Sequence, residues 1–201
     1  TLDDVTMADA QVPLLLDPDE YLADCFRLAN KIWADGYRPD FLVVPWRGGA
    51  LPGIVIDELF RYNGHEFSRT AIRMESLGRV VQGVRCNIRG LGHMTNEVES
   101  GHKMLIVDDL FNTGQTMYEV IEYLRRRARC NTPEIRVATV YSRLGSCAFL
   151  VSPHYYLHSV LESPVFPHEL TAFVSERLAE TDPELFEAIS GSRQPDPAAG
   201  T

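Results

Sequence analysis

The stretch Lys103–Met117, KMLIVDDLFNTGQTM, constrains this chain more than any other part of it. Met104–Val107 is an unbroken apolar run, which is typical of a strand buried on both faces. Asp108 and Asp109 follow the run, and a small polar loop then leads into apolar residues at helical spacing. This order of strand, acidic pair, loop and helix predicts one unit of a parallel α/β sheet.

The loop between this strand and its helix has the composition of an anion site. A helix N-terminus presents unpaired backbone N–H groups and the positive end of the helix dipole. Gly114 permits close approach, and the hydroxyls of Thr113 and Thr116 can donate hydrogen bonds, so a phosphate is the expected ligand. Carboxylates would repel a phosphate, so Asp108 and Asp109 suit sugar hydroxyls or Mg²⁺. A sugar phosphate is therefore predicted, and an ordinary capped helix behind a polar loop is the alternative.

A second strand, loop and helix precede this stretch. Phe41–Pro45 is apolar, Trp46-Arg47-Gly48-Gly49 follows it, and a helix is expected from Leu51 to Tyr62. The two glycines expose backbone N–H groups at the helix start, and the arginine adds positive charge, so this loop is a second candidate anion site. A tight turn explains the same residues equally well.

Together the two stretches resemble the type I phosphoribosyltransferases, and most closely the members that act on the 6-oxopurines xanthine, guanine or hypoxanthine. Lys103–Met117 is similar to that family's motif for 5-phosphoribosyl diphosphate (PRPP), an apolar strand with two acidic residues and a D-T-G-x-T loop. The Arg47 loop, followed by Pro52 and Gly53, resembles the family's pyrophosphate loop. The resemblance covers about residues 40–170. It implies a twisted parallel sheet with helices on both faces, a homodimer, and a non-proline cis peptide before Arg47.

The resemblance assigns a set of residues to each part of PRPP. The 5′-phosphate is assigned to Asn112, Thr113, Gly114, Gln115 and Thr116, and the pyrophosphate to Arg47, Gly48 and Gly49. Asp108 and Asp109 are assigned as the catalytic carboxylates that hold the ribose hydroxyls. Asp109 is the expected ligand of the Mg²⁺ cofactor, which arrives with PRPP.

Three residues near the expected base site depart from the family's pattern. Asn112 stands where many purine members carry Asp, and an amide has too little basicity to serve as a general base. Arg143 stands at or beside a Lys that contacts the exocyclic oxygen of the base, where a guanidinium can donate two hydrogen bonds. Pro164 replaces an aromatic residue that stacks on the purine, which leaves Phe166 as the stacking candidate. Either the base arrives as its anion, or another group takes its proton, or the base is not a common 6-oxopurine.

The remaining segments complete one domain. Residues 1–18 are expected to form an N-terminal arm, 19–190 the phosphoribosyltransferase-like domain and 191–201 a flexible tail. Residues 75–102 match the family's mobile loop in position, although a solvated hairpin is an alternative. Residues 160–170 are expected to form a small hood, followed by C-terminal helices; a plain helix-entry turn is the alternative there.

The first helix is expected to begin after Asp17, whose side chain would cap it, and to end near Ala34. Helical spacing places one set of apolar side chains on its inward face. That set is Leu22, Phe26, Ala29 and Trp33.

Composition limits the partners. The net charge of −9 over 201 residues argues against a nucleic-acid footprint across the whole surface. The arginines at 125–129 complement the dipole at a helix C-terminus, with RNA binding as the alternative. No apolar run has membrane length, and the four cysteines lack metal-ligand spacing, so we expect no membrane partner and a cytoplasmic location.

The leading hypothesis is a phosphoribosyltransferase of the purine-salvage kind. It would transfer the 5-phosphoribosyl group from PRPP to a nitrogenous base, with a purine as the expected acceptor, and give a nucleoside 5′-monophosphate and pyrophosphate. A regulator that keeps the fold but binds RNA or a protein partner is the second hypothesis. An enzyme that attaches ribose phosphate to an unusual base is the third.

Overall fold

The computed structural model describes residues 15–76, 86–143, 145, 149–169 and 183–190. The chain divides into two compact units, Thr1–Pro164 and Val165–Thr201, each of which is described by itself. Most of the predicted arm, the middle of the predicted mobile loop, residues 170–182 of the predicted C-terminal helices and the tail lie outside the described residues. The boundary between the units falls inside the predicted hood.

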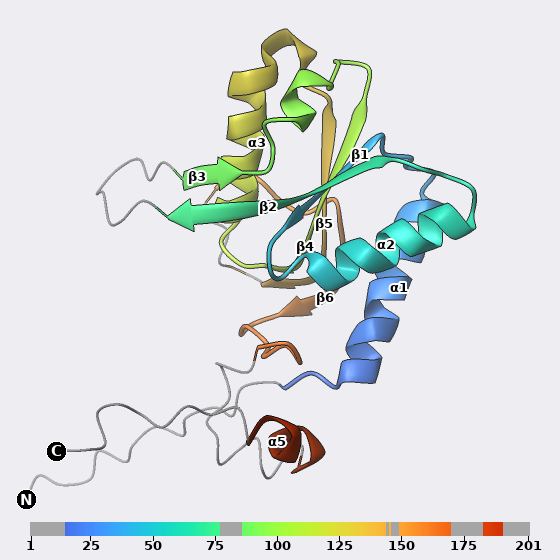
Figure 1. Cartoon of the computed structure of the whole chain (residues 1–201), viewed down its shortest axis with the longest axis vertical. Coiled ribbons are helices and arrows are strands. Elements are labelled where there is room, and N and C mark those ends of the chain that lie inside the picture. Colours follow the sequence, from blue (N-terminus) through green and yellow to red (C-terminus); the bar gives the residue numbers. More distant parts are fainter. Residues whose placement is uncertain (1–14, 77–85, 144, 146–148, 170–182, 191–201) are drawn as a thin grey trace, which may run out of the picture. The chain divides into compact units, whose positions relative to one another are not determined.

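A mixed sheet forms the centre of the first unit (Figure 1). Among the described residues, six strands lie in the order β3-β2-β1-β4-β5-β6. Their bounds are Phe41–Pro45 for β1, Ser68–Ser76 for β2, Cys86–Arg89 for β3, Lys103–Phe111 for β4, Glu134–Arg143 for β5 and Tyr155–Val160 for β6. Neighbouring strands are parallel except β2 and β3, which are antiparallel. The predicted parallel α/β sheet is confirmed, and β3 adds an antiparallel edge.

Helices cover both faces of this sheet, as predicted. Figure 1 shows α1, Pro18–Ala34, and α2, Ala50–Tyr62, on one face, and α3, Gln115–Ala128, on the other. Short 3₁₀ turns lie at Met94–Asn96 and Arg129–Asn131. In the second unit, α5 spans Pro183–Ser190, within the segment where C-terminal helices were expected. Within the described residues, none of the helices has the length and apolar character needed to span a membrane.

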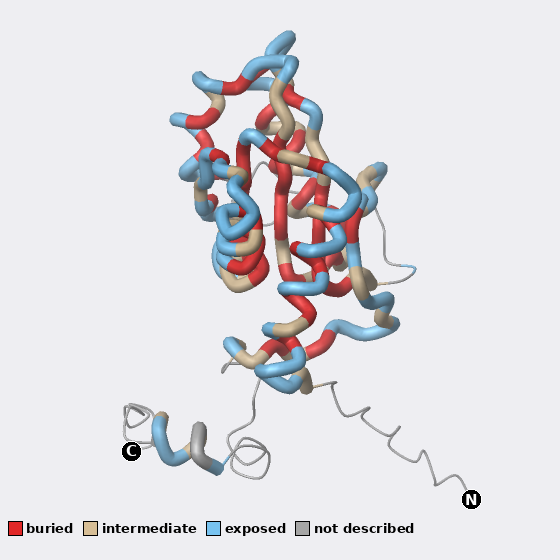
Figure 2. The backbone as a smooth tube through the Cα atoms, turned by 90° about the vertical axis from the view of Figure 1, so that its right-hand side faces the viewer, coloured by how far each residue is buried: buried red, intermediate tan, exposed pale blue. Residues whose placement is uncertain are grey.

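The apolar runs of the sequence are the buried centres of the strands. Met104, Leu105, Ile106 and Val107 of β4 are all 0% exposed. Figure 2 shows buried residues concentrated along the strands, with exposed residues on the outer sides of the helices. A strand covered on both faces has no polar face to alternate with, which explains why these runs lack a period of two.

The predicted start and end of α1 are confirmed, and its predicted inward face is partly wrong. Asp17 Oδ1 accepts hydrogen bonds from the backbone N–H groups of Asp19 and Glu20 at 3.0 and 2.9 Å. Leu22 and Phe26, which were expected to face inward, are 40% and 45% exposed. The buried residues of the helix are Tyr21, Asp24, Cys25, Leu28, Ala29 and Ile32.

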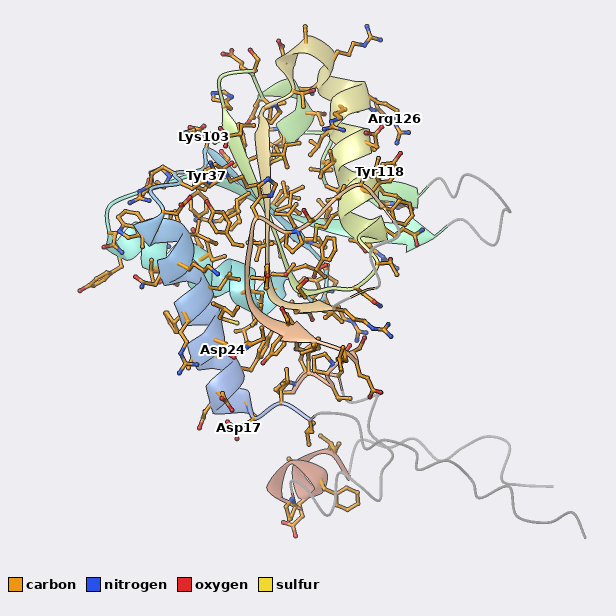
Figure 3. The ribbon with its side chains drawn as sticks, turned by 180° about the vertical axis from the view of Figure 1, so that it is seen from behind. Asp17, Asp24, Tyr37, Lys103, Tyr118 and Arg126 are labelled. Atoms are coloured by element: carbon orange, nitrogen blue, oxygen red, sulfur yellow. The ribbon has the colours of Figure 1, made fainter. Side chains whose placement is uncertain are left out.

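The buried carboxylate of Asp24 explains the error. It contacts His158 Nε2 at 2.7 Å and the Tyr141 hydroxyl at 3.4 Å, and it pairs with Arg27. Figure 3 shows Asp24 along α1, with Asp17 at the helix start. Hydrophobic spacing treats an aspartate as exposed, whereas here partners from β5 and β6 make its burial possible.

Candidate active site

The strand order creates a crevice between β1 and β4. From β1 the chain passes through α2 to β2 on one side, and from β4 it passes through α3 to β5 on the other. The loops after β1 and β4 therefore diverge at the carboxyl ends of neighbouring parallel strands, which is where open α/β sheets bind ligands. Both candidate anion loops predicted from the sequence lie at this switch point.

The loop after β4 opens onto a cavity of about 340 Å³. The lining residues are Met74, Asp108, Leu110, Phe111, Asn112, Thr113, Gly114, Gln115, Thr116, Met117 and Glu119. Gly114 has a φ of +82°, a left-handed conformation that glycine adopts without strain, and a Cβ there would lie 2.8 Å from the Phe111 ring. As the N-cap residue of α3, Gly114 has no side chain to cap the helix. All five predicted 5′-phosphate residues thus line one cavity at a helix N-terminus.

Glu119 is a lining residue that sequence reasoning missed. It lies one helical turn after Gln115, whose side-chain amide donates to Glu119 Oε1 at 3.0 Å. Helical spacing places residues four apart on one face, so the signal was present in the sequence. The contact holds the Gln115 side chain along the helix.

The loop after β1 packs against the acidic pair. The peptide bond between Trp46 and Arg47 is cis, as the family resemblance implied. A Cβ on Gly48 would lie 2.4 Å from Asp109 Oδ1, and a Cβ on Gly49 would lie 2.3 Å from the Val107 carbonyl oxygen. Only glycine therefore fits at either position. Arg47 is exposed beside them, where it can meet an anion that approaches from solvent.

The two aspartates lie within β4, because the strand runs to Phe111 and does not end before the pair as predicted. Asp108 lines the cavity, whereas Asp109 is 9% exposed and lies next to Gly48. Asp108 Oδ1 accepts from the Asp109 N–H at 3.2 Å, and Asp109 Oδ1 accepts from the Leu110 N–H at 2.6 Å. Burial and the neighbouring charge of Asp109 raise the pKa of Asp108 well above its usual range.

The donor set of this pair fits Mg²⁺. Carboxylate oxygens are hard ligands, and proteins bind Mg²⁺ through one or two of them, with substrate phosphates and water completing the shell. Among the described residues, no group of three or more His, Cys, Asp or Glu side chains could hold a metal ion. A Mg²⁺ ion whose shell is completed by substrate phosphates and water does not need a cluster of three protein ligands. It would also relieve the repulsion that raises the pKa of Asp108.

The structure joins two of the residues that depart from the family's pattern. Arg143, the last residue of β5, donates from Nη1 to Asn112 Oδ1 at 3.2 Å. Its Nε donates to the Leu161 carbonyl oxygen at 3.0 Å. The sequence predicted each residue near the base but gave no sign that they contact each other.

The remaining predicted site residue, Phe166, belongs to the second unit. Its ring stacks on His168 with a centroid distance of 5.6 Å, and its N–H donates to Glu169 Oε2 at 3.2 Å. These local contacts fix the turn that carries Phe166. Its role beside the base remains a prediction.

Two of the arginines at the end of α3 contact residues of their own helix. Arg125 pairs with Glu122 at 3.1 Å, and the Arg127 guanidinium lies 5.4 Å from the centroid of the Tyr123 ring. Figure 3 shows Arg126 and Tyr118 on this same helix. These contacts accord with the structural interpretation of the cluster, in which positive charge complements the helix dipole.

Several known proteins share this architecture. The sequence model of the phosphoribosyl transferase domain family matches residues 15–167. A solved purine phosphoribosyltransferase from Pyrococcus horikoshii is similar, with a TM-score of 0.60 and 23% identity over 77% of this chain and 92% of that chain. No curated protein sequence is similar enough to be matched with this chain.

Two further solved structures have a TM-score of 0.59 to this chain. One is a hypoxanthine phosphoribosyltransferase from Trypanosoma cruzi, 15% identical over 78% of this chain and 82% of that chain. The other is a hypothetical protein from Neisseria gonorrhoeae with bound ppGpp, 14% identical over 89% of this chain and 96% of that chain. At such identities the likeness concerns the fold. With the family match over most of its length, the chain belongs to the phosphoribosyl transferase domain family, has the type I fold and is an enzyme of this class.

Proposed function

We propose that this enzyme transfers the 5-phosphoribosyl group of PRPP to a purine base and releases pyrophosphate. The observation that carries the proposal is the pair of anion loops that flank two adjacent carboxylates at one switch point. A ligand with a phosphate at one end, a diol in the middle and a pyrophosphate at the other end matches these three parts in order.

Each part of PRPP has its own residues in this proposal. Asn112, Thr113, Gly114, Gln115 and Thr116 hold the 5′-phosphate at the N-terminus of α3. Asp108 and Asp109 accept hydrogen bonds from the ribose hydroxyls. Arg47, Gly48 and Gly49 hold the pyrophosphate. Asp109 is adjacent to the Gly48 loop, so it is the proposed ligand of the Mg²⁺ that neutralises the pyrophosphate.

Catalysis in this site rests on positioning and electrostatics. The bond between C1′ and the pyrophosphate oxygen breaks, and its electron pair leaves with pyrophosphate. C1′ then carries developing positive charge, which the two aspartates stabilise from β4. The loops hold both ends of PRPP, so the base meets C1′ in a fixed geometry.

The identity of the base is the finer part of the proposal. Solved relatives of similar fold are named as purine and hypoxanthine phosphoribosyltransferases, which supports a purine. Arg143 and Phe166 are the proposed base contacts. A homodimer and a cytoplasmic location complete the proposal.

The test is calorimetric titration with PRPP and Mg²⁺. Wild-type protein should bind, and an Asp108→Asn/Asp109→Asn variant should not, because the ribose hydroxyls and Mg²⁺ lose both negative charges and asparagine keeps only weaker, neutral acceptors. An Asp57→Asn/Glu58→Gln variant removes the same two charges from α2, away from the loops, and should bind like wild type. Pyrophosphate release with a panel of bases then identifies the acceptor. A folded wild type that binds no PRPP would refute the proposal.

A further inference from the structure

One hydrogen bond ties the loop after β4 to the end of β5. Arg143 Nη1 donates to Asn112 Oδ1 at 3.2 Å, and the Leu161 carbonyl oxygen holds Arg143 Nε at 3.0 Å. Phe111 and Ser142, the residues that precede this pair, are register partners in neighbouring strands. The bond is therefore set by the strand pairing, and Asn112 is presented to the cavity in an orientation that Arg143 fixes.

The strand order decides which side of the ribose the base approaches. The pyrophosphate loop follows β1, and Arg143 ends β5, so the two lie on opposite sides of β4. Displacement at C1′ is in line, so the incoming nitrogen arrives opposite the departing oxygen. If pyrophosphate leaves on the β1 side, the base enters on the β5 side. It then meets Asn112 and Arg143.

Neither of these two side chains can take a proton from the base. A guanidinium has donors and no acceptor, and it stays charged in proteins. A carboxamide oxygen is barely basic, and this one already accepts a hydrogen bond from a cation. The pair thus offers the ring an amide N–H donor and a positive charge. If a neutral base turned its ring N–H toward this pair, that N–H would face the amide N–H of Asn112. Two donors cannot form a hydrogen bond with each other.

We propose that the acceptor is an anionic heterocycle, a base that has lost its ring proton to solvent before transfer, and that Asn112 and Arg143 select this form. The inference rests on the proposed phosphoribosyl transfer and adds the ionisation state of its acceptor. A lone pair on the anionic ring nitrogen forms the bond to C1′, and the bond from C1′ to the pyrophosphate oxygen breaks with its electron pair. No proton moves between base and protein in this step.

A competing scheme would use a carboxylate of the cavity as general base. Glu119 is held to the Gln115 amide on α3, on the phosphate side of the cavity. Asp108 is the other carboxylate that lines the cavity, and in the proposed function it binds the ribose hydroxyls. In the first scheme the ionisation of the base controls the rate, and in the second the ionisation of a protein carboxylate does. A protein carboxylate titrates at one pH whatever base is supplied, so the two schemes predict different pH profiles.

The experiment compares kcat/KM against pH for bases of graded acidity: hypoxanthine, xanthine and their 8-aza analogues. We expect each profile to rise as that base ionises, so its inflection should move with the acidity of the base. Asn112→Asp supplies an acceptor, so below the pKa of a base it should raise kcat/KM for the neutral form by about tenfold or more. Arg143→Gln keeps a donor but removes the charge, so it should lower kcat/KM for the anion with little change in the Kd of PRPP.

Two results would overturn the inference while leaving the proposed function intact. One is an inflection at the same pH for every base, which would point to a protein group. The other is PRPP binding, shown by calorimetry, without transfer to even the most acidic base. Absence of PRPP binding would instead remove the proposed function, and the inference with it.

Discussion

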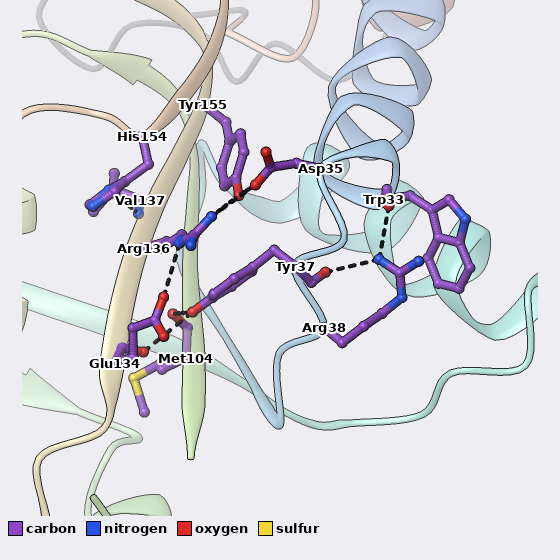
Figure 4. A network of polar contacts seen from close by, with 10 residues as sticks. All are labelled: Trp33, Asp35, Tyr37, Arg38, Met104, Glu134, Arg136, Val137, His154 and Tyr155. Atoms are coloured by element: carbon purple, nitrogen blue, oxygen red, sulfur yellow. Dashed lines mark hydrogen bonds and ion pairs between the residues drawn. The ribbon is translucent and has the colours of Figure 1, made fainter. Parts of the chain in front are cut away.

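The two ends of the central sheet are built in opposite ways. At the amino ends of the strands, side chains from several elements satisfy one another (Figure 4). The Tyr37 hydroxyl donates to the Met104 carbonyl oxygen at 2.9 Å, and Arg136 pairs with Asp35 at 2.9 Å and with Glu134 at 3.0 Å. At the carboxyl ends, by contrast, Gly48 packs directly against Asp109, and the adjacent carboxylates of Asp108 and Asp109 repel each other.

The pKa shifts of two aspartates report this difference. The hydrogen bond from the Tyr155 hydroxyl, at 2.6 Å, and the Arg136 guanidinium lower the pKa of Asp35. Burial and the charge of Asp109 raise the pKa of Asp108. One end of the sheet therefore stabilises the fold. The other end retains a repulsion between two carboxylates, which a bound cation would relieve.

Gly49→Ala should have the largest effect, and on activity. The new Cβ would lie 2.3 Å from the Val107 carbonyl oxygen, so the loop after β1, which is proposed to hold the pyrophosphate, has to move. A displacement of about 1 Å in a positioning loop costs about a hundredfold in kcat/KM. Gly101→Ala is the matched control, because a Cβ there meets nothing within 4 Å and the residue lies just before the amino end of β4. Equal activity of the Gly49→Ala and Gly101→Ala variants would contradict the difference described between the two ends of the sheet.

Arg136→Met should destabilise the fold and spare the site. It removes the partner of Asp35 and Glu134 and a donor to the Tyr155 hydroxyl, at a cost of about 1 to 2 kcal/mol. Urea unfolding measures the loss, and kcat/KM at 25 °C should stay near wild type. Arg125→Met, which breaks a single exposed pair with Glu122, should cost less than about 0.5 kcal/mol. A large fall in activity for Arg136→Met would show that the two ends are not independent.

Asp108→Asn should raise Tm by a few degrees at neutral pH while weakening PRPP binding. Because the folded pKa is raised, the native state holds more protons than the unfolded chain between about pH 3.9 and that pKa. Wild-type stability therefore falls as pH rises through this window, and the variant lacks this fall. Thermal melts from pH 4 to 8 test the sign. A lower Tm for the variant would contradict the account of the carboxyl end.

Asp35→Asn should have the smallest effect, with the opposite dependence on pH. The lowered folded pKa means that the Asp35 contribution is present above the unfolded pKa of about 3.9 and is lost as pH falls through the folded value. The variant should therefore lose slightly less stability than wild type on acidification. Melts between pH 2 and 5 provide the measurement, and a stronger acid sensitivity of the variant would be the contrary outcome.

The strand–loop–helix units could be predicted from sequence, because buried runs such as Phe41–Pro45 and the glycines after them are local signals. The acidic pair and the glycine-containing loop after β4 are local signals of the same kind. What was missed depends on contacts between distant residues. The burial of Asp24 requires Tyr141 and His158, which lie 117 and 134 positions away in the chain.

The same limit applies to the base side of the site. Asn112 and Arg143 are 31 positions apart, so no local pattern could show that one orients the other. Their separate assignments near the base were possible only through the family resemblance. That the two residues together offer a donor and a positive charge but no proton acceptor could be inferred only from the structure.

The bond between Asn112 and Arg143 also bears on how such a site can change its substrate over generations. An aspartate at 112 would form an ion pair with Arg143. A lysine at 143 would lack the planar guanidinium that orients the amide of Asn112. Either replacement alone therefore also changes how the remaining side chain is oriented toward the cavity. Residues 112 and 143 should therefore be inherited as a unit, and lineages that exchange one should exchange the other close in time.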